Sequence, residues 1–204
     1  RGTETARAVA KIRLTRAGGL PAGSGWGFLL GRGLLLTNNH VVADRETAHL
    51  AEAIFDYQED EDFRLMTPKR FRLTRDVFRS SSGTALDYTL VSVAAESAEG
   101  EPLSAFGHLP LVEASGKALK GEPVSIVQHP RGGPKAIALR DSTILGVSGD
   151  FVYYSTDTAP GSSGAPVLND QWLPVALHHR SVPHPRLAGA WIANRGVRIS
   201  RILG

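Results

Sequence analysis

Residues 160–167 read PGSSGAPV, a tight turn that leads into an apolar strand. A turn of this composition is often only a loop. It also suits a nucleophile, because backbone N–H groups beside an acyl-transfer nucleophile must converge on an oxyanion, and Gly161 permits such a concave backbone. Gly164 keeps the bulk low behind the serines, and Pro166 fixes the chain as it enters the strand. The turn therefore predicts a reactive serine if a base lies beside it.

Two further segments place polar chemistry at the edges of apolar strands. LTNNHVV, residues 36–42, ends an apolar run and delivers His40, and ALDYTLV, residues 85–91, carries Asp87 inside an apolar pattern. Each has a plain structural interpretation, since a lone His is usually a surface or hydrogen-bonded residue and an Asp often caps a turn. Together with the serine turn they supply a nucleophile, a base and a group that orients the base.

Period-two alternation of apolar and polar residues runs through most of the chain and indicates short strands. A polar stretch without periodicity separates two groups of strands, and a tail with apolar residues among arginines predicts one short helix over residues 196–203. Many short strands in two groups favour two packed antiparallel barrels or sandwiches, between which the pattern alone does not choose. The expected strands are 8–15, 25–30, 33–36, 53–57, 70–74, 86–93, 123–127, 136–139, 151–154, 165–168, 173–177 and 189–192.

Composition limits the possible classes of protein. The 204 residues are 42% hydrophobic and 21% charged, which excludes a disordered or fibrous chain, and the 22 glycines and 12 prolines agree with many turns. The absence of cysteine excludes disulfides, thiol nucleophiles and thiolate metal sites. No apolar run approaches the roughly 18 residues that cross a bilayer. The net charge of +3 is typical of an ordinary soluble surface, and the basic residues are scattered, so we expect no specific nucleic-acid partner.

Residues 37–42, 86–90 and 161–166 resemble the three signature segments of chymotrypsin-fold, trypsin-like serine proteases. The resemblance covers nearly the whole chain, and its most specific motif is Gly-x-Ser-Gly-x-Pro in the third segment. Residues 127–130 and 175–179 are similar to the bacterial branch that includes the V8-type glutamyl endopeptidases. A missing trypsin-type zymogen Asp before the nucleophile and the missing disulfides also fit a bacterial-type member.

The resemblance implies an all-β fold of two packed antiparallel six-stranded β-barrels with a short C-terminal helix. Residues 1–94 would form the barrel that carries His and Asp, residues 95–117 the connection, and residues 118–204 the barrel that carries the nucleophile. The sequence begins without Met and shows no signal-peptide pattern. We therefore expect either a mature secreted enzyme or the protease module of a larger multidomain or operon-encoded system.

The resemblance also assigns the residue roles. The motif register makes Ser163, rather than Ser162, the nucleophile, with His40 as the base and Asp87 as its orienter. The backbone amides of Gly161 and Ser163 would form the oxyanion hole. The implied function is that of a serine endopeptidase that acts on polypeptides through an acyl-enzyme, with no metal or organic cofactor. The alternative is a catalytically silent pseudoprotease that serves as a binding or scaffold module.

The specificity pocket has two interpretations. By resemblance, Asp157 would select Arg or Lys, whereas Thr158, His178 and Ser181 would bind an acidic side chain; Asp157 and His178 also have plain structural interpretations. The similarity of residues 175–179 to the V8-type branch slightly favours the acidic reading. Acidic selection should then weaken as the pH rises through the pKa of His178, about 6.5 if unperturbed. Large aromatic side chains should be disfavoured, because they would leave buried polar groups unpaired.

Two other clusters carry weaker signals. Asp56, Glu59, Asp60, Glu61 and Asp62 could offer oxygen ligands to Ca²⁺, but they lack a Gly-centred coordination loop, so a solvated acidic loop is favoured. His129 lies in a turn, HPRGGP, where a loop role is favoured over a catalytic one.

Overall fold

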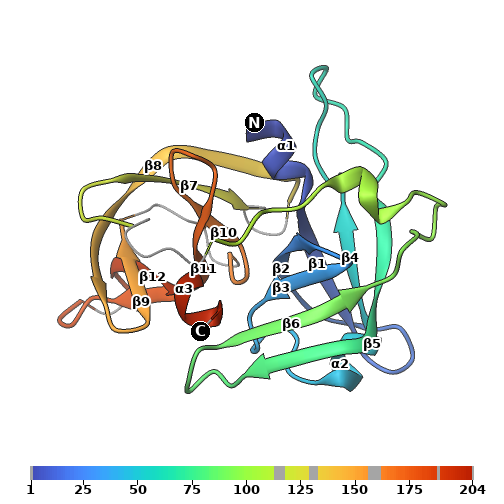
Figure 1. Ribbon diagram of the computed structural model, residues 1–204, viewed down its shortest axis with the longest axis horizontal. Coiled ribbons are helices and arrows are strands. Elements are labelled where there is room, and N and C mark those ends of the chain that lie inside the picture. Colours follow the sequence, from blue (N-terminus) through green and yellow to red (C-terminus); the bar gives the residue numbers. More distant parts are fainter. Residues whose placement is uncertain (1, 113–117, 129–132, 156–161, 188, 204) are drawn as a thin grey trace.

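The computed structural model describes residues 2–112, 118–128, 133–155, 162–187 and 189–203. It contains two closed antiparallel barrels of six strands each, which lie side by side (Figure 1). The all-β, two-barrel prediction is confirmed, and the choice between barrels and sandwiches is settled in favour of barrels. No helix in the described part of the chain has the length and apolar character needed to cross a membrane.

The first barrel is built from the N-terminal half of the chain and has the strand order β1-β2-β3-β6-β5-β4. The pairing of β3 with β6 matters most for function, because it sets Thr37 opposite Thr89 and so brings the ends of two distant segments together. Its strands are β1 (Val9–Thr15), β2 (Pro21–Gly31), β3 (Leu34–Thr37), β4 (Ala51–Phe55), β5 (Lys69–Ser81) and β6 (Tyr88–Val93).

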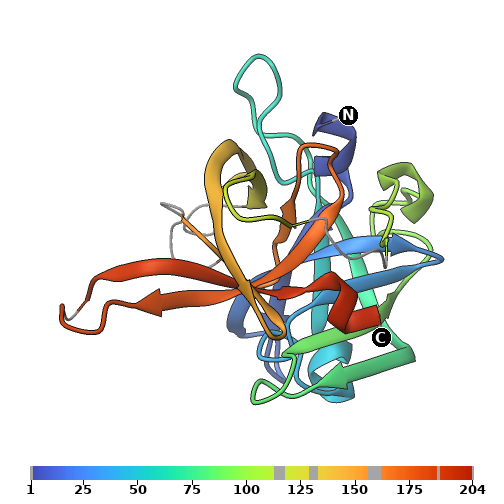
Figure 2. The ribbon, with the colours of Figure 1, turned by 60° about the vertical axis from the view of Figure 1, so that its left-hand side comes forward.

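The second barrel has the order β10-β11-β12-β9-β8-β7. Its longest hairpin, formed by β11 and β12, extends away from the body of the molecule (Figure 2). Its strands are β7 (Pro123–Gln128), β8 (Ala136–Ser148), β9 (Phe151–Tyr154), β10 (Pro166–Leu168), β11 (Pro174–Pro183) and β12 (Trp191–Arg198).

Within the described residues the structure has four short helical segments, namely α1 (Gly2–Arg7), α2 (Arg45–His49), the 3₁₀ turn η1 (Leu103–Phe106) and α3 (Ile199–Leu203). The C-terminal helix is therefore present, but it begins later than residue 196. The reason is that Gly196 and Arg198 still pair with β11, so the ladder hydrogen bonds hold this stretch extended. The strands β5, β8 and β11 are also longer than the sequence predicted. Each contains a shift of register at which the alternation of apolar and polar residues is interrupted.

The barrel interiors are mostly apolar, and Trp26 links the two barrels. Phe55, Phe71 and Phe106 meet in the first barrel, with ring centroids 4.6–5.5 Å apart. Trp26 belongs to strand β2 of the first barrel, yet it packs in the core cluster of the second, beside Ala165. The backbone N–H of Trp26 also donates to the carbonyl oxygen of Ser163 over 2.9 Å, so the turn that carries Ser163 is bonded directly to the first barrel.

Candidate active site

His40 and Asp87 meet because the strands that carry them are paired. His40 follows the end of β3 and Asp87 immediately precedes β6. The His40 ring nitrogen Nδ1 lies 2.7 Å from Asp87 Oδ2, and the His40 backbone N–H donates to Asp87 Oδ1 over 3.0 Å. The Asp87 side chain is fully buried, whereas the His40 side chain is 45% exposed. The arrangement holds one edge of the imidazole and leaves the other edge open.

The backbone of Asp87 is held in an uncommon conformation. Its φ is +46°, in the left-handed region that Asp tolerates better than most residues. The buried side chain of Asn38 fixes this turn, because its Nδ2 donates to the carbonyl oxygen of Asp87 over 2.9 Å. Burial by itself would raise the pKa of the Asp87 carboxyl, but hydrogen bonds from His40 and the attraction of His40 and His179 lower the pKa below its ordinary value. Asp87 is therefore ionised at neutral pH.

Ser163 sits where the second barrel touches the first. The hydrogen bond from the Trp26 backbone N–H to the Ser163 carbonyl oxygen holds Ser163 in place. The neighbouring Gly164 adds a second constraint, since a Cβ atom at Gly164 would lie 2.0 Å from the carbonyl oxygen of Trp26. Gly164 also has φ +89°, a conformation that side chains rarely adopt. The low bulk that the sequence predicted behind the serines thus has a physical cause, which is the close approach of β2.

The two adjacent serines point in different directions. The hydroxyl of Ser162 is buried and donates to the side-chain oxygen of Gln128, inside the second barrel. The hydroxyl of Ser163 is half-buried and donates to the carbonyl oxygen of His179 over 3.3 Å. Among the described residues its hydrogen-bond partner is therefore that carbonyl rather than the expected His40 ring. To give its proton to His40, the hydroxyl must exchange this carbonyl for the imidazole as its partner.

A second histidine, which the sequence analysis did not single out, completes the cluster. His179 Nε2 lies 3.2 Å from Asp87 Oδ2, and the His179 ring stacks on His40 with centroids 6.1 Å apart and an interplanar angle of 28°. Burial lowers the pKa of His179 to about 4; the nearby Asp87 carboxylate opposes this shift, and Arg180 and Arg195 add to it. Strand alternation gave no signal for this contact, because the register of β11 against β12 shifts between His178 and Arg180 and leaves His179 at an irregularity.

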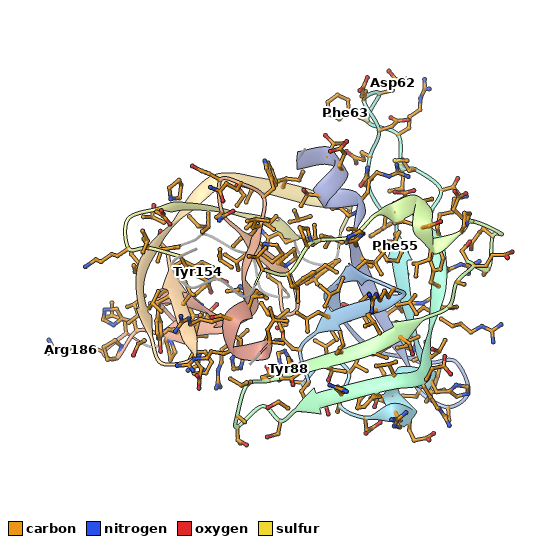
Figure 3. All side chains as sticks on the ribbon, viewed as in Figure 1. Phe55, Asp62, Phe63, Tyr88, Tyr154 and Arg186 are labelled. Carbon is orange, nitrogen blue, oxygen red and sulfur yellow. The ribbon has the colours of Figure 1, made fainter. Side chains whose placement is uncertain are left out.

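His178, which precedes His179, points into the second barrel. Its Nδ1 lies 2.6 Å from the hydroxyl of Tyr154, the fully buried aromatic residue labelled within that barrel in Figure 3. Burial lowers the pKa of His178 to about 3, and repulsion from His179 and His40 acts in the same direction. The expected titration near 6.5 is therefore wrong for the protein without substrate, in which His178 is uncharged at neutral pH.

The remaining predicted pocket residues are only partly placed. Ser181 is half-buried on β11, and its hydroxyl donates to Asn194 Oδ1 over 2.7 Å. Asp157, Thr158 and Gly161 lie outside the described residues. The structure therefore brings His178 and Ser181 onto one strand and leaves the position of the other three as predictions.

Among the described residues, one group of side chains has ligand atoms close enough together to consider a metal ion. His40, Asp87 and His179 each offer one ligand atom, all within 4.8 Å of one another. Two ligands of a tetrahedral zinc ion are roughly 3.3 Å apart, given bonds of about 2.0–2.1 Å. The 2.7 Å contact between His40 Nδ1 and Asp87 Oδ2 is shorter than this and matches a hydrogen bond instead.

The acidic loop and His129 do not join the site. Asp62 and Phe63 lie at the tip of a long loop that stands away from both barrels (Figure 3). The carboxylate of Asp60 already accepts the backbone N–H groups of Asp62 and Arg64, each over 2.9 Å, so it closes a turn. His129 lies outside the described residues.

The comparison with protein families decides the classification. Residues 23–177 match the family model described as a trypsin-like peptidase domain. The chain belongs to the trypsin-like peptidase family. This membership confirms the resemblance drawn from the three signature segments, while the V8-type branch stays a prediction.

Relatives and solved structures agree with this membership. The chain is 38% identical over 238 aligned positions to the uncharacterized protein y4fB of Sinorhizobium fredii, covering 100% of this chain and 36% of that protein. It is 30% identical over 191 positions to the secreted RxLR effector protein 73 of Plasmopara viticola, covering 84% of this chain and 44% of that protein. The chain thus spans less than half the length of these two relatives.

Two solved structures show the same fold. The active form of the Rv3671c protease from M. tuberculosis matches with a TM-score of 0.68 at 17% identity, covering 100% of this chain and 81% of that chain. The inactive form of the Rv3671c protease matches with a TM-score of 0.64 at 19% identity, covering 99% and 88%.

Proposed function

We propose that this trypsin-like peptidase is a serine endopeptidase in which Ser163 is the nucleophile, His40 the general base and Asp87 the orienting carboxylate. The observation that carries the proposal is the 2.7 Å contact between His40 Nδ1 and Asp87 Oδ2. An ionised carboxylate only accepts hydrogen bonds, so this contact places the imidazole proton on Nδ1 and leaves the lone pair on Nε2. A base with that tautomer is ready to take the proton of a serine hydroxyl.

The reaction follows from this arrangement. Ser163 Oγ attacks the carbonyl carbon of the peptide bond while its proton passes to His40 Nε2, and the ionised Asp87 stabilises the resulting imidazolium. His40 then gives the proton to the leaving amine as the C–N bond breaks, which leaves an acyl-enzyme on Ser163. Water then attacks the acyl carbon and loses a proton to His40, and His40 returns this proton to Ser163 Oγ as the ester C–O bond breaks and the acid leaves. The backbone amides of Gly161 and Ser163 would stabilise the oxyanion in both halves.

We further propose that the substrate carries an acidic side chain at the cleaved residue. Burial keeps the pKa of Tyr154 above its ordinary value, so Tyr154 stays a phenol and can donate its proton to His178 Nδ1. His178 then carries its own proton on Nε2, where a neutral N–H can donate to a substrate carboxylate. Asp157 remains the competing determinant, and if its side chain enters the pocket the preference should reverse toward Arg or Lys.

The orientation of Ser163 gives one reason to keep the pseudoprotease alternative. In the described structure its hydroxyl rests on the His179 carbonyl oxygen, 3.3 Å away, and not on the His40 imidazole. If that orientation persisted with substrate bound, the chain would bind peptides without cleaving them. The buried, ionised Asp87 favours the enzyme, because its costly burial is offset by the hydrogen bond that orients the His40 ring.

Cleavage profiling with a peptide library tests the proposal. The purified chain should cleave peptides after acidic residues, and Ser163→Ala should cleave none of them. Ser162→Ala is the matched control, since it alters the adjacent serine whose hydroxyl faces Gln128, and it should keep most of the activity. Cleavage by Ser163→Ala at the rate of the unmodified chain contradicts the nucleophile, and a profile dominated by Phe, Tyr or Leu contradicts the polar pocket.

A further inference from the structure

The outer part of the hairpin formed by β11 and β12 stands apart from the second barrel. β12 pairs with β9 only from Val197 to Asn194, whereas its pairing with β11 continues outward to Trp191, opposite Pro183. Beyond Asn194 the hairpin therefore has only its own two strands in the part of the chain that the structure describes, and it projects from the molecule (Figure 2). We call this projection, residues 182–187 and 189–193, the arm. A hairpin of two strands is only marginally stable in water by itself, so a partner that covers the arm would stabilise it.

The arm exposes three large apolar side chains near its tip. Trp191 is 62% exposed, Leu187 is 59% exposed and Ile192 is 52% exposed. Ile192 lies where the register of β11 against β12 shifts between Val182 and Pro183. Apolar residues that are scattered singly over a surface are normal, but a group of them on one protruding tip marks a contact surface.

The chain that forms the arm carries positive charge and no negative charge. No acidic residue follows Asp170, whereas residues 171–204 contain five arginines. Arg180, at the base of the arm, and Arg186, near its tip, are exposed, and the described residues give neither side chain an ion-pair or hydrogen-bond partner. Arg186 lies at the end of the molecule that is farthest from the first barrel (Figure 3). These charges favour an anionic partner.

The backbone at the tip is largely hydrogen-bonded within its own turn. The ring nitrogen Nδ1 of His184 accepts the backbone N–H groups of Arg186 and Leu187, each over 3.1 Å. The backbone N–H of His184 donates to the carbonyl oxygen of Ala190 over 2.8 Å, and the N–H of Ala190 donates to the carbonyl oxygen of Leu187 over 3.2 Å. A backbone group without a partner is costly in lipid, where no water can replace the partner. This turn can therefore leave water with little loss of hydrogen bonding.

We propose that the arm docks on the surface of a membrane that contains anionic phospholipids. Trp191, Leu187 and Ile192 enter the boundary between headgroups and acyl chains, where Trp side chains are enriched, and Arg186 contacts the lipid phosphates. A protein partner is disfavoured by size. Three side chains of at most about 250 Å² each do not reach the roughly 800 Å² that each partner buries in a standard interface. The contact is peripheral and needs no membrane-spanning segment.

Sedimentation with lipid vesicles tests this proposal. The unmodified chain should bind mixed vesicles of phosphatidylcholine and phosphatidylserine, and should bind vesicles of phosphatidylcholine alone about tenfold more weakly or less. Trp191→Ser should lower the affinity for the mixed vesicles about tenfold or more, because the burial of a large apolar side chain is lost. Arg186→Glu should lower it about tenfold, because an attraction to the anionic surface becomes a repulsion.

Two control variants make the same chemical changes outside the arm. Phe63→Ser removes a side chain that is 84% exposed at the tip of the acidic loop, and Arg16→Glu reverses an exposed charge between β1 and β2. Both should bind the mixed vesicles as the unmodified chain does, because neither residue belongs to the arm. Thermal unfolding should show that all of these variants are folded.

Fluorescence gives a second readout that reports on the arm itself. Trp191 is the most exposed of the three tryptophans, since Trp26 is 1% exposed and Trp172 is partly buried. Its emission should move to shorter wavelengths when mixed vesicles are added, because its ring leaves water. Trp191→Phe should lose this shift.

Several results would overturn the membrane contact. It fails if the folded unmodified chain does not bind the mixed vesicles, or if Trp191→Ser or Phe63→Ser bind them equally well. Equal binding to vesicles with and without phosphatidylserine overturns the anionic partner. Self-association that Trp191→Ser abolishes, without vesicle binding, overturns the lipid partner and assigns the arm to a second copy of the chain. None of these outcomes depends on peptide hydrolysis, so they decide the role of the arm independently of the proposed function.

Discussion

Replacing Gly164 by Ala should push the turn that carries Ser163 away from strand β2 of the first barrel. The new Cβ would lie 2.0 Å from the Trp26 carbonyl oxygen and 2.9 Å from Thr37 Oγ1, at a backbone φ of +89°. Real Cβ atoms essentially never come closer than 3.0 Å to such atoms, so β2 must retreat by about 1 Å. Left-handed strain costs about 1–2 kcal/mol and the displaced packing about 1–3 kcal/mol more, which gives roughly 2–5 kcal/mol of lost stability.

Gly121 offers a closely matched control. It has the same φ of +89°, but nothing lies within 4 Å of the position that its Cβ would take. Gly121→Ala therefore carries the backbone strain without the collision, and the difference between the two variants in urea-induced unfolding isolates the contact with Trp26. We also expect Ser163 in Gly164→Ala to react far more slowly with a fluorophosphonate, because its carbonyl loses the Trp26 N–H. Equal losses of stability in the two variants, with normal labelling, refute this account of how the nucleophile is placed.

Three further outcomes can be checked on the same protein. Burial lowers the pKa of Lys135 from 10.5 to about 8, so between these pH values the unfolded chain binds more protons than the folded chain and stability rises with pH. In urea titrations the free energy of unfolding of the unmodified chain, relative to Lys135→Met, should increase by on the order of 1–3 kcal/mol between pH 7.5 and 10. Parallel pH dependence of the two proteins contradicts this. Asp87→Asn should stay folded but hydrolyse peptides about 10⁴-fold more slowly, because His40 loses its fixed tautomer, and near-normal turnover opposes the assignment. EDTA should leave peptide hydrolysis unchanged, whereas loss with EDTA and recovery with Zn²⁺ or Ca²⁺ would show that a metal is required.

The barrel fold was predictable because its strands are short, bounded by turns and mostly alternating. The alternation of apolar and polar residues failed to predict the ends of strands that are stabilised by hydrogen bonds to a neighbouring strand rather than by burial of their own apolar residues. The charged stretch of β5 beyond Thr74 continues as a strand because it pairs with β6 across a bulge. Residues 196–198 likewise looked helical from their composition and are extended because they pair with β11. Helices α1 and α2 were missed, since each is too short to show a helical period.

The site residues that could be predicted are those whose residue type and neighbouring turn or strand end already indicate a catalytic role. His40, Asp87 and Ser163 each stood at the edge of an apolar strand, and the strand pairing brought the first two together as expected. The contact of His179 with Asp87 was not predictable in this way, because it depends on how two barrels pack rather than on either segment. The neutral state of His178 was missed for a related reason, which is that its burial against Tyr154 arises only in the folded barrel.

Mass spectrometry of the chain after treatment with a fluorophosphonate shows whether Ser163 is an activated nucleophile. We expect one covalent adduct, mapped by peptide analysis to Ser163, in the unmodified chain and in Ser162→Ala. Ser163→Ala should form no adduct, and labelling of His40→Ala should be strongly slowed, because Ser163 then lacks its base. An unmodified chain that stays unlabelled, or an adduct on another residue that persists in Ser163→Ala, would contradict the assignment of Ser163 as an activated nucleophile.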